Sequence, residues 1–204
     1  ITFPCRSRSS LQPETLLYNN GSMTERITTA QGFPPREHDH RMCVATALTT
    51  AEDLCRQRGA RLTAQRRRVL ELVWASHTPI GAYDLLARLS ESKESKVAPP
   101  TVYRALDFLL VHGLVHRIES LNAYIGCACP ETSHTGHFLI CRRCHMAAEV
   151  QDPSLADALR ACATRYGFAP EQETVELRGL CPACRAAPET AFPQQNQTMD
   201  PHAR

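Results

Sequence analysis

The chain has 204 residues, of which 43% are hydrophobic and 22% are charged, which excludes wholesale disorder and allows one or two domains with a real core. The formal net charge of +2 is unevenly distributed: residues 56–117 carry eleven basic and five acidic side chains (+6), residues 1–55 sum to −1 and residues 118–204 sum to −3. A basic middle between acidic ends predicts one region that meets a polyanion and a second region with another task.

The two ends of the chain lack a hydrophobic period. Residues 1–44 mix Pro, Ser, Thr, Asn and Gln, and residues 187–204 are rich in Pro and Gln, so we expect a disordered extension and a disordered tail. Ordered structure is predicted from residue 45. An amphipathic helix over residues 45–60, ended by Gly59, places four apolar residues on one face: Ala45, Leu48, Leu54 and Cys55.

Three further helices are predicted in the basic middle of the chain. Thr63 is the expected N-cap of a helix over residues 64–77, and the next helix is expected over residues 81–92. A Pro-Pro pair before Thr101 sets the start of a helix over residues 101–113, because proline is tolerated in a first turn.

A β-hairpin is predicted directly after the last of these helices. Residues 114–120 and 123–127 alternate polar and apolar side chains around a short turn. Helices followed by such a hairpin predict a winged helix-turn-helix domain, which we place at residues 45–128.

The remainder of the chain predicts a second, smaller domain. A hinge loop is expected over residues 129–136, and an α/β domain over residues 137–186. Its elements are strands at 137–141, 147–151 and 172–181 and a helix at 153–166. The predicted fold class is therefore α+β.

Two C-x-x-C pairs carry the strongest chemical signal, Cys141-Arg-Arg-Cys144 and Cys181-Pro-Ala-Cys184. Each pair can form a two-thiolate knuckle, and two knuckles supply all four ligands of a structural zinc ion. The 36 residues between the pairs exceed the usual gap of a zinc ribbon. The predicted strand, helix and strand between them would return the second pair to the first.

Two other uses of these cysteines are weaker. Cys141 to His145 matches the C-x-x-C-H motif of c-type haem attachment, but haem would leave Cys181 and Cys184 without a role and would require export. A thioredoxin-like enzyme needs a C-x-x-C that opens a helix after a strand, which neither pair provides. We find no signal peptide and no apolar run of about 20 residues. A reducing cytoplasm is therefore the expected location.

Further candidate ligands surround the junction of the two predicted domains. One set combines His116 and Cys127 on the hairpin, His134 in the hinge loop and Glu149 on a strand of the second domain. Two imidazoles, a thiolate and a carboxylate suit zinc, and the sulfur argues against a dedicated iron or manganese site. Spacing alone does not choose between this set and three competing residues: Cys129, His137 and His145.

The basic middle of the chain fits DNA. Arg104 lies early in the predicted recognition helix, where its side chain can reach guanine O6 and N7, and Tyr83 and Tyr103 are candidates for phosphate or thymine-methyl contacts. Sequence-independent attraction is expected from five other basic residues: Arg61, Arg66, Arg67, Lys93 and Lys96.

Four segments together resemble the ferric uptake regulator superfamily, and within it the zinc uptake regulator branch: RLTAQRRRVLELV, PPTVYRALDFLLVHGLVHRIES, HFLICRRC and GLCPAC. The resemblance extends from about residue 45 to about residue 185, and its motifs occur in the family's order. It implies a homodimeric winged-helix repressor with a C-terminal dimerisation domain. Such a repressor binds double-stranded operators of zinc-uptake genes when zinc is plentiful.

The resemblance also implies roles for individual residues, with about two zinc ions per chain. The structural zinc site would comprise Cys141, Cys144, Cys181 and Cys184, and the regulatory zinc site His116, Cys127, His134 and Glu149. Tyr83, Tyr103 and Arg104 match the DNA-contacting positions. The His-His-Asp-His run of many iron-sensing relatives is absent here, and His145 stands where glycine is common after the first knuckle.

Functions of other classes are compatible with parts of the sequence. An iron-, manganese- or nickel-responsive regulator of the same superfamily is the nearest alternative. A cytoplasmic thiol-disulfide protein would need one reactive cysteine of low pKa, and a zinc-dependent protein adaptor would lack salt-sensitive affinity for DNA. The sequence contains no catalytic carboxylate pair, nucleophile triad or phosphate-binding glycine loop, so we expect no enzyme, no membrane partner and no small ligand other than zinc.

Overall fold

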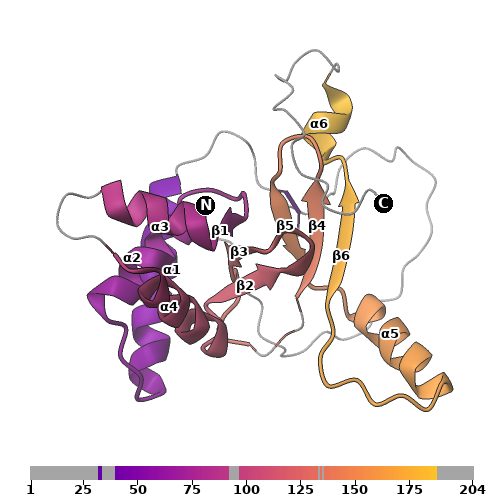
Figure 1. Cartoon of the computed structure of the whole chain (residues 1–204). Helices are drawn as coiled ribbons and strands as arrows, with labels where there is room; N and C mark the ends of the chain where they lie inside the picture. The colour runs from indigo at the N-terminus through magenta and orange to yellow at the C-terminus, as the bar shows by residue number, and fades with distance from the viewer. Residues whose placement is uncertain (1–31, 34–39, 92–96, 133, 135, 188–204) are drawn as a thin grey trace, which may run out of the picture.

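The computed structural model describes residues 32–33, 40–91, 97–132, 134 and 136–187. Four helices lie on one side of a first three-stranded sheet, and a second three-stranded sheet lies on the other side (Figure 1). No helix in the described ranges is long and apolar enough to cross a membrane. The mixture of helices and two separate sheets confirms the predicted α+β class.

The helical half consists of α1 (His40–Gln57), α2 (Ala64–Trp74), α3 (Ala82–Glu91) and α4 (Pro99–Val111). The Thr63 side chain caps α2 by accepting a hydrogen bond from the Arg66 backbone N–H at 3.4 Å, as predicted. The buried faces of the four helices form one core that includes Leu54, Leu85 and Leu106. Two predictions need correction: α1 begins at His40 instead of residue 45, and Ala45 is exposed.

The first sheet has the strand order β1–β3–β2 and is antiparallel, with β1 (Ile80–Gly81), β2 (Val115–Ile118) and β3 (Ala123–Gly126). A 3₁₀ turn and Asn122 in the left-handed region (φ 47°) join β2 to β3. Gly126 is required by packing, since a Cβ atom there would lie 2.2 Å from the Trp74 ring. The hairpin is therefore the wing of a winged helix, seated on α2.

The second sheet has the order β5–β4–β6, with β4 (His137–Cys141), β5 (Ala147–Val150) and β6 (Val175–Gly179). β5 runs antiparallel to β4, and β6 runs parallel to it after a crossover through α5 (Pro153–Arg165). The short helix α6 (Pro182–Ala186) follows β6. Because parallel pairing brings the carboxyl ends of β4 and β6 together, both C-x-x-C pairs reach the same end of the sheet.

The wing and the second sheet are packed against each other. Ile118 and Ile125 of the wing share a small core with Phe138, Ile140 and Ala147 of β4 and β5. On β6, the Glu176 carboxylate accepts hydrogen bonds from the backbone N–H groups of Glu119 (2.6 Å) and Ser120 (3.1 Å). Apolar and polar contacts therefore both connect the two halves.

The structure differs from prediction mainly at short or terminal elements. β1 and α6 were not predicted, residues 40–44 are helical instead of belonging to the extension, and α2 ends at Trp74. Residues 1–31, 34–39 and 188–204, which include most of the predicted disordered ends, lie outside the described residues, and so do Lys93 and Lys96.

Candidate metal and DNA-binding sites

The two C-x-x-C pairs meet as predicted. One sulfur atom from each of Cys141, Cys144, Cys181 and Cys184 lies within 4.8 Å of the others, and we call this set the four-cysteine cluster. Backbone N–H groups point at the sulfurs: Cys181 donates to Cys141 Sγ at 3.3 Å and Cys184 to Cys181 Sγ at 3.4 Å. Closely packed sulfurs that accept backbone N–H bonds are the donor set of a closed tetrahedral zinc site.

The thiol pKa values in this cluster diverge. Burial would raise the pKa of Cys141, but hydrogen bonds from the backbone of Cys144, Cys181 and Arg143 outweigh it and lower that pKa to about 6. At Cys184, burial and then the neighbouring thiols raise the pKa to about 12. Without a cation, the cluster therefore favours one thiolate and opposes a second. A divalent metal would remove this opposition, because its positive charge stabilises the thiolates.

The turn after the first knuckle contains a residue with a positive φ angle. His145 has φ 59°, in the left-handed region, and its N–H donates to the Cys141 carbonyl at 2.9 Å. A non-glycine side chain is strained in this conformation, which glycine adopts freely. His145 itself is exposed.

The four residues predicted at the domain junction also converge, and we call them the junction cluster: His116, Cys127, His134 and Glu149. His134 Nε2 lies 2.5 Å from Glu149 Oε1, 3.2 Å from His116 Nε2 and 3.4 Å from Cys127 Sγ. His116 Nε2 lies 3.0 Å from the same Glu149 oxygen. The wing, the loop and β5 each contribute, so the cluster bridges the two halves of the molecule.

The fit of a cation to the junction cluster can be judged from two atoms. Glu149 Oε1 is buried and forms no hydrogen bond of acceptable geometry with any described residue, although two imidazole nitrogens face it. His134 Nδ1 lies 2.8 Å from the Thr132 carbonyl, to which only a protonated Nδ1 can donate, and this tautomer leaves a lone pair on Nε2. A lone pair on His134 Nε2 that faces a buried carboxylate oxygen suits a divalent cation.

Charge interactions within the junction cluster shift two pKa values. Burial alone would raise the pKa of Glu149, but contacts with His116 and His134 overcome it and hold the pKa at about 2. The close contact with the Glu149 carboxylate raises the pKa of His134, against the effect of burial. In the absence of metal, a proton on His134 therefore compensates the carboxylate.

Local packing places His134 within reach of the wing. A Cβ atom added to Gly136 would lie 2.6 Å from the Phe138 ring and 3.4 Å from His116 Nδ1. Only glycine lets the loop pass this closely. His116 and His134 also line a groove of about 630 Å³ whose rim includes Glu119, Glu171 and Glu173. Arg117 and Arg160 line the same groove, so its charge is mixed. The groove is open to solvent, which permits an ion to exchange.

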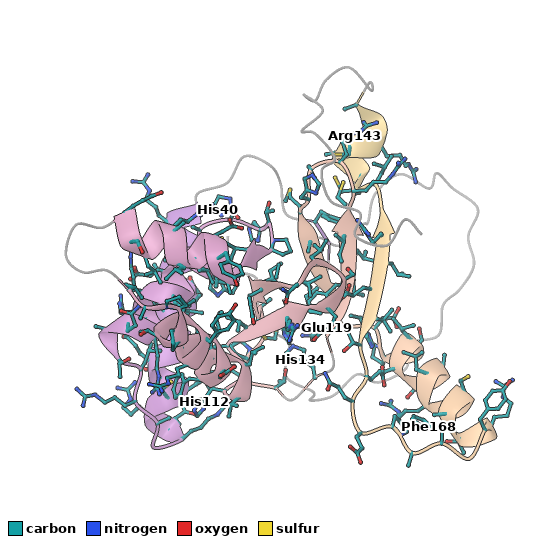
Figure 2. All side chains as sticks on the ribbon, in the orientation of Figure 1. His40, His112, Glu119, His134, Arg143 and Phe168 are labelled. Carbon is teal, nitrogen blue, oxygen red and sulfur yellow. The ribbon has the colours of Figure 1, made fainter. Side chains whose placement is uncertain are left out.

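The three competing residues do not join the junction cluster. The His137 side chain is buried, its Nε2 lies 2.7 Å from Glu173, and it is not among the donors of the junction cluster. His145 is exposed after the knuckle, and Cys129 is not among the donors that converge. Figure 2 places His134 in the middle of the molecule beside β2, and Arg143, next to the four-cysteine cluster, beside α6.

Each of the predicted DNA-contacting residues is exposed on the helical half. Arg104 and Tyr103 lie on the face of α4 opposite the buried Val102, Ala105 and Leu106. Tyr83 on the neighbouring α3 is 77% exposed. The aromatic and basic groups are therefore free to reach a ligand without unfolding the core.

Three of the five other basic residues can be placed. Arg61 is exposed. The Arg66 guanidinium lies 3.6 Å from the centroid of the Phe108 ring, and Arg67 forms an ion pair with Glu52 and a second one with Glu71 at 3.4 Å. Arg66 and Arg67 thus stabilise the helical half, and Arg67 in particular contributes less free positive charge than its position in the sequence indicated.

Comparison with known proteins gives the chain a family. Residues 57–178 match the model described as the ferric uptake regulator family. This chain belongs to the ferric uptake regulator family. The zinc uptake regulation protein of Escherichia coli (strain K12) is 42% identical over 151 residues, which are 74% of this chain and 88% of that protein. The zinc uptake regulation protein of Mycobacterium tuberculosis (strain ATCC 25618 / H37Rv) is 30% identical over 131 residues, 63% of this chain and 97% of that protein.

Solved structures of family members agree with this fold. A zinc uptake regulator complexed with zinc and DNA superimposes with a TM-score of 0.66 at 42% identity, covering 70% of this chain and 95% of that one. Holo XcZur superimposes with a TM-score of 0.64 at 44% identity, covering 70% and 99%. In both fold and sequence, this family member is similar to zinc uptake regulators.

One group of potential metal ligands was not predicted from the sequence. His40, Cys43 and His77 bring their donor atoms within 4.8 Å of one another. His40 and Cys43 are three residues apart, a spacing that places both on one helix face, but the predicted helix began only at residue 45. The contribution of His77 from a distant loop had no local signal.

Proposed function

We propose that this protein is a zinc-responsive transcriptional repressor that binds palindromic operators of zinc-uptake genes as a homodimer. The observation that carries the proposal is the junction cluster, in which His116 and Cys127 of the wing, His134 of the loop and Glu149 of β5 converge from both halves of the chain. Relatives that are 42% identical are zinc uptake regulators, one of them solved with zinc and DNA.

In this proposal the junction cluster holds the regulatory zinc and the four-cysteine cluster holds a structural zinc, about two ions per chain. Residues 45–128 act as the DNA-binding unit, residues 129–136 as the hinge and residues 137–186 as the dimerisation unit. A metal bonded to donors from both halves favours one relative orientation of them. Zinc shifts that equilibrium only by its differential affinity for the closed form, with about 5.5 kcal/mol needed to move from 1:99 to 99:1.

We assign the DNA contacts to Tyr83, Tyr103 and Arg104, which are exposed on α3 and α4. In a dimer, the relative orientation of the two halves sets the distance between two copies of α4. That distance must match half-sites about one helical turn apart, or a multiple of it, on a palindromic operator. Reciprocity requires that DNA tighten zinc binding by the same factor by which zinc tightens DNA binding.

Dimerisation is supported by apolar surface on the second half. β6 is an edge strand of its sheet, and α5 buries none of its residues within the chain. Leu177 on β6 is 57% exposed and Phe168 after α5 is 67% exposed. A second copy of the chain would cover this edge and this helix. The family regulates transcription, so we propose a role in the cytoplasm with DNA and not as an enzyme.

The test is a DNA-binding titration with metal analysis. Duplexes selected from a random pool in excess zinc serve as the operator, and fluorescence anisotropy measures affinity against zinc, iron and manganese. We expect mild chelation to remove the regulatory zinc and to retain the structural zinc, with a loss of roughly 10- to 100-fold in DNA affinity that zinc alone restores. DNA binding that ignores metal, or that iron restores equally well, would contradict the proposal.

Single substitutions separate the two clusters. Cys127→Ala should abolish the zinc-dependent gain in DNA affinity and leave a folded dimer, whereas Cys144→Ala should impair folding or dimerisation because it opens a closed zinc site. Cys162→Ser is the matched control, since Cys162 is exposed on α5 and outside both clusters. Wild-type zinc responsiveness in Cys127→Ala would refute the assignment of the junction cluster.

A further inference from the structure

A third group of metal-binding side chains lies at the start of α1, apart from the two clusters described above. The donor atoms of His40, Cys43 and His77 all lie within 4.8 Å of one another, and all three residues are half-buried. The imidazole rings of His40 and His77 have centroids 4.9 Å apart at an interplanar angle of 43°. We call this set the α1–loop cluster.

The two segments that form this cluster are held in place by other contacts. His40 and Cys43 lie one turn apart on α1, so their side chains point to the same side. His77 lies in the loop between α2 and β1, where the Thr78 N–H donates to Ser76 Oγ at 3.2 Å. The His77 carbonyl accepts a hydrogen bond from the Ala147 N–H of β5 at 3.0 Å. The approach of His77 to α1 is therefore fixed by the backbone.

We propose that the α1–loop cluster binds a third divalent zinc ion. Two imidazoles and one thiolate are ligands that zinc prefers, whereas magnesium, calcium and manganese favour oxygen donors, which this trio lacks. Three protein ligands leave a fourth tetrahedral position for water, as in zinc sites that exchange ligands. The ion joins the first turn of α1 to the loop whose backbone contacts β5.

This site is separate from the other two in residues and in place. It shares no residue with the junction cluster or the four-cysteine cluster. In Figure 2, His40 lies on the helical half, away from His134 and Arg143. A second contact involves the same end of the chain: Phe33 packs against the four-cysteine cluster.

Cobalt spectroscopy on a chain without the thiolate of the junction cluster tests the site directly. Cys127→Ala protein, with zinc retained in its four-cysteine cluster, is titrated with Co²⁺. We expect about one equivalent to bind with a sulfur-to-cobalt charge-transfer band and the visible bands of tetrahedral cobalt, and zinc to displace it. A sulfur band would arise from the α1–loop cluster, because no other thiolate cluster then remains open among the described residues. Absence of the band overturns the proposal.

Further variants assign the band to the cluster. Adding Cys43→Ser should remove the sulfur band, and adding His77→Ala should remove or weaken it, whereas adding the exposed control Cys162→Ser should leave it unchanged. A band that persists in Cys43→Ser protein overturns the proposal. Circular dichroism checks folding of each variant, and if His77→Ala does not fold, the Cys43→Ser result decides.

Proteolysis gives a second readout that needs no cobalt. Arg41 is exposed between His40 and Cys43, so trypsin cleavage after it reports local opening of α1. Zinc should slow this cleavage several-fold in Cys127→Ala protein but not when Cys43→Ser is added, and equal protection in both would count against the site. Neither readout involves DNA, so failure of the repressor function and failure of this site are distinguishable.

Discussion

Arg104 is the residue on which operator choice should depend most. It is exposed on α4 while its neighbours Val102 and Ala105 are buried, so its guanidinium projects from the helix that we assign to the major groove. Contacts to base edges confer specificity, whereas contacts to phosphate confer only affinity. The role of Arg104 is therefore measured by discrimination between sequences.

We predict that Arg104→Ala loses about 1–3 kcal/mol of discrimination between operator and random DNA and largely keeps its nonspecific affinity. Competition anisotropy with both duplexes at one fixed salt concentration measures the difference. Arg88→Ala is a control, because Arg88 is an exposed arginine in the last turn of α3 with no role in our proposal. Equal weakening on all sequences would make Arg104 a phosphate contact instead.

The junction cluster should make zinc binding sensitive to pH. The close contact with the Glu149 carboxylate raises the pKa of His134, and a protonated imidazole cannot ligate metal, so protons compete with zinc as the pH falls. Glu149 has a pKa of about 2 and stays ionised at any pH near neutrality, so it adds nothing to this dependence. Zinc affinity is therefore highest above the raised pKa of His134 and falls as the pH is lowered through it.

We expect zinc affinity, measured by competition with a chelator, to fall steadily as the pH is lowered from about 8 to about 6. His134→Gln should bind zinc more weakly and with a shallower pH dependence, since one of the ligands that exchange a proton for zinc is gone. The chelator's own proton binding is corrected with a protein-free titration. A pH dependence as steep in His134→Gln as in the unaltered protein would show that another group titrates.

Among the secondary-structure elements, long periodic helices were predicted well and short ones were not. The pattern around Leu70 and Leu106 specified α2 and α4 within a few residues. β1 contains only two residues and exists because Ile80 and Gly81 pair with Tyr124 and Ala123 of the wing. Neither β1 nor the five-residue α6 is long enough to show a hydrophobic period.

The N-cap of α2 offers a test at this scale. Thr63→Ala should destabilise the protein by about 1 kcal/mol, because the hydrogen bond from the Arg66 N–H to Thr63 Oγ1 is lost. Thr63→Ser keeps the hydroxyl and should stay close to the unaltered protein. Urea unfolding, followed by circular dichroism, compares the unaltered protein with the two variants. Equal midpoints for the alanine and serine variants would show that the cap does not stabilise α2.

For the whole molecule, the decisive feature is how the two halves meet. The core shared by Ile118, Ile125 and Phe138, together with the Glu176 contacts to the wing, brings the wing beside β4 and β5. That arrangement is what allows donors 33 residues apart in the chain, His116 and Glu149, to lie 3.0 Å apart. The exposed edge at β6 then leaves a surface for the second copy.

We predict that Leu177→Asp weakens the dimer by about 10-fold or more, because it places a charge in the apolar surface that the partner would cover. Val111→Asp is the matched control, as Val111 is 82% exposed at the end of α4, away from β6. Sedimentation velocity over a concentration series measures the association. A dimer of unchanged strength in Leu177→Asp would place the interface elsewhere.

The sequence by itself determined the elements whose signals are local. Thr63, Pro99, Pro100 and the apolar period of α4 specify helices through neighbouring residues, and each C-x-x-C pair specifies a knuckle within four residues. The junction cluster could be named from the sequence only with the help of a family resemblance, because seven candidate ligands had suitable chemistry.

Tertiary structure alone decided which of those ligands meet. His137 and Cys129 have the same chemistry as the chosen residues, but His137 is paired with Glu173 and Cys129 lies outside the converging set. His77 reaches the start of α1 only because its loop is held by Ser76 and Ala147. A metal site depends on distances between segments far apart in the chain, and these distances follow from the packing of one element on another, which no local pattern encodes.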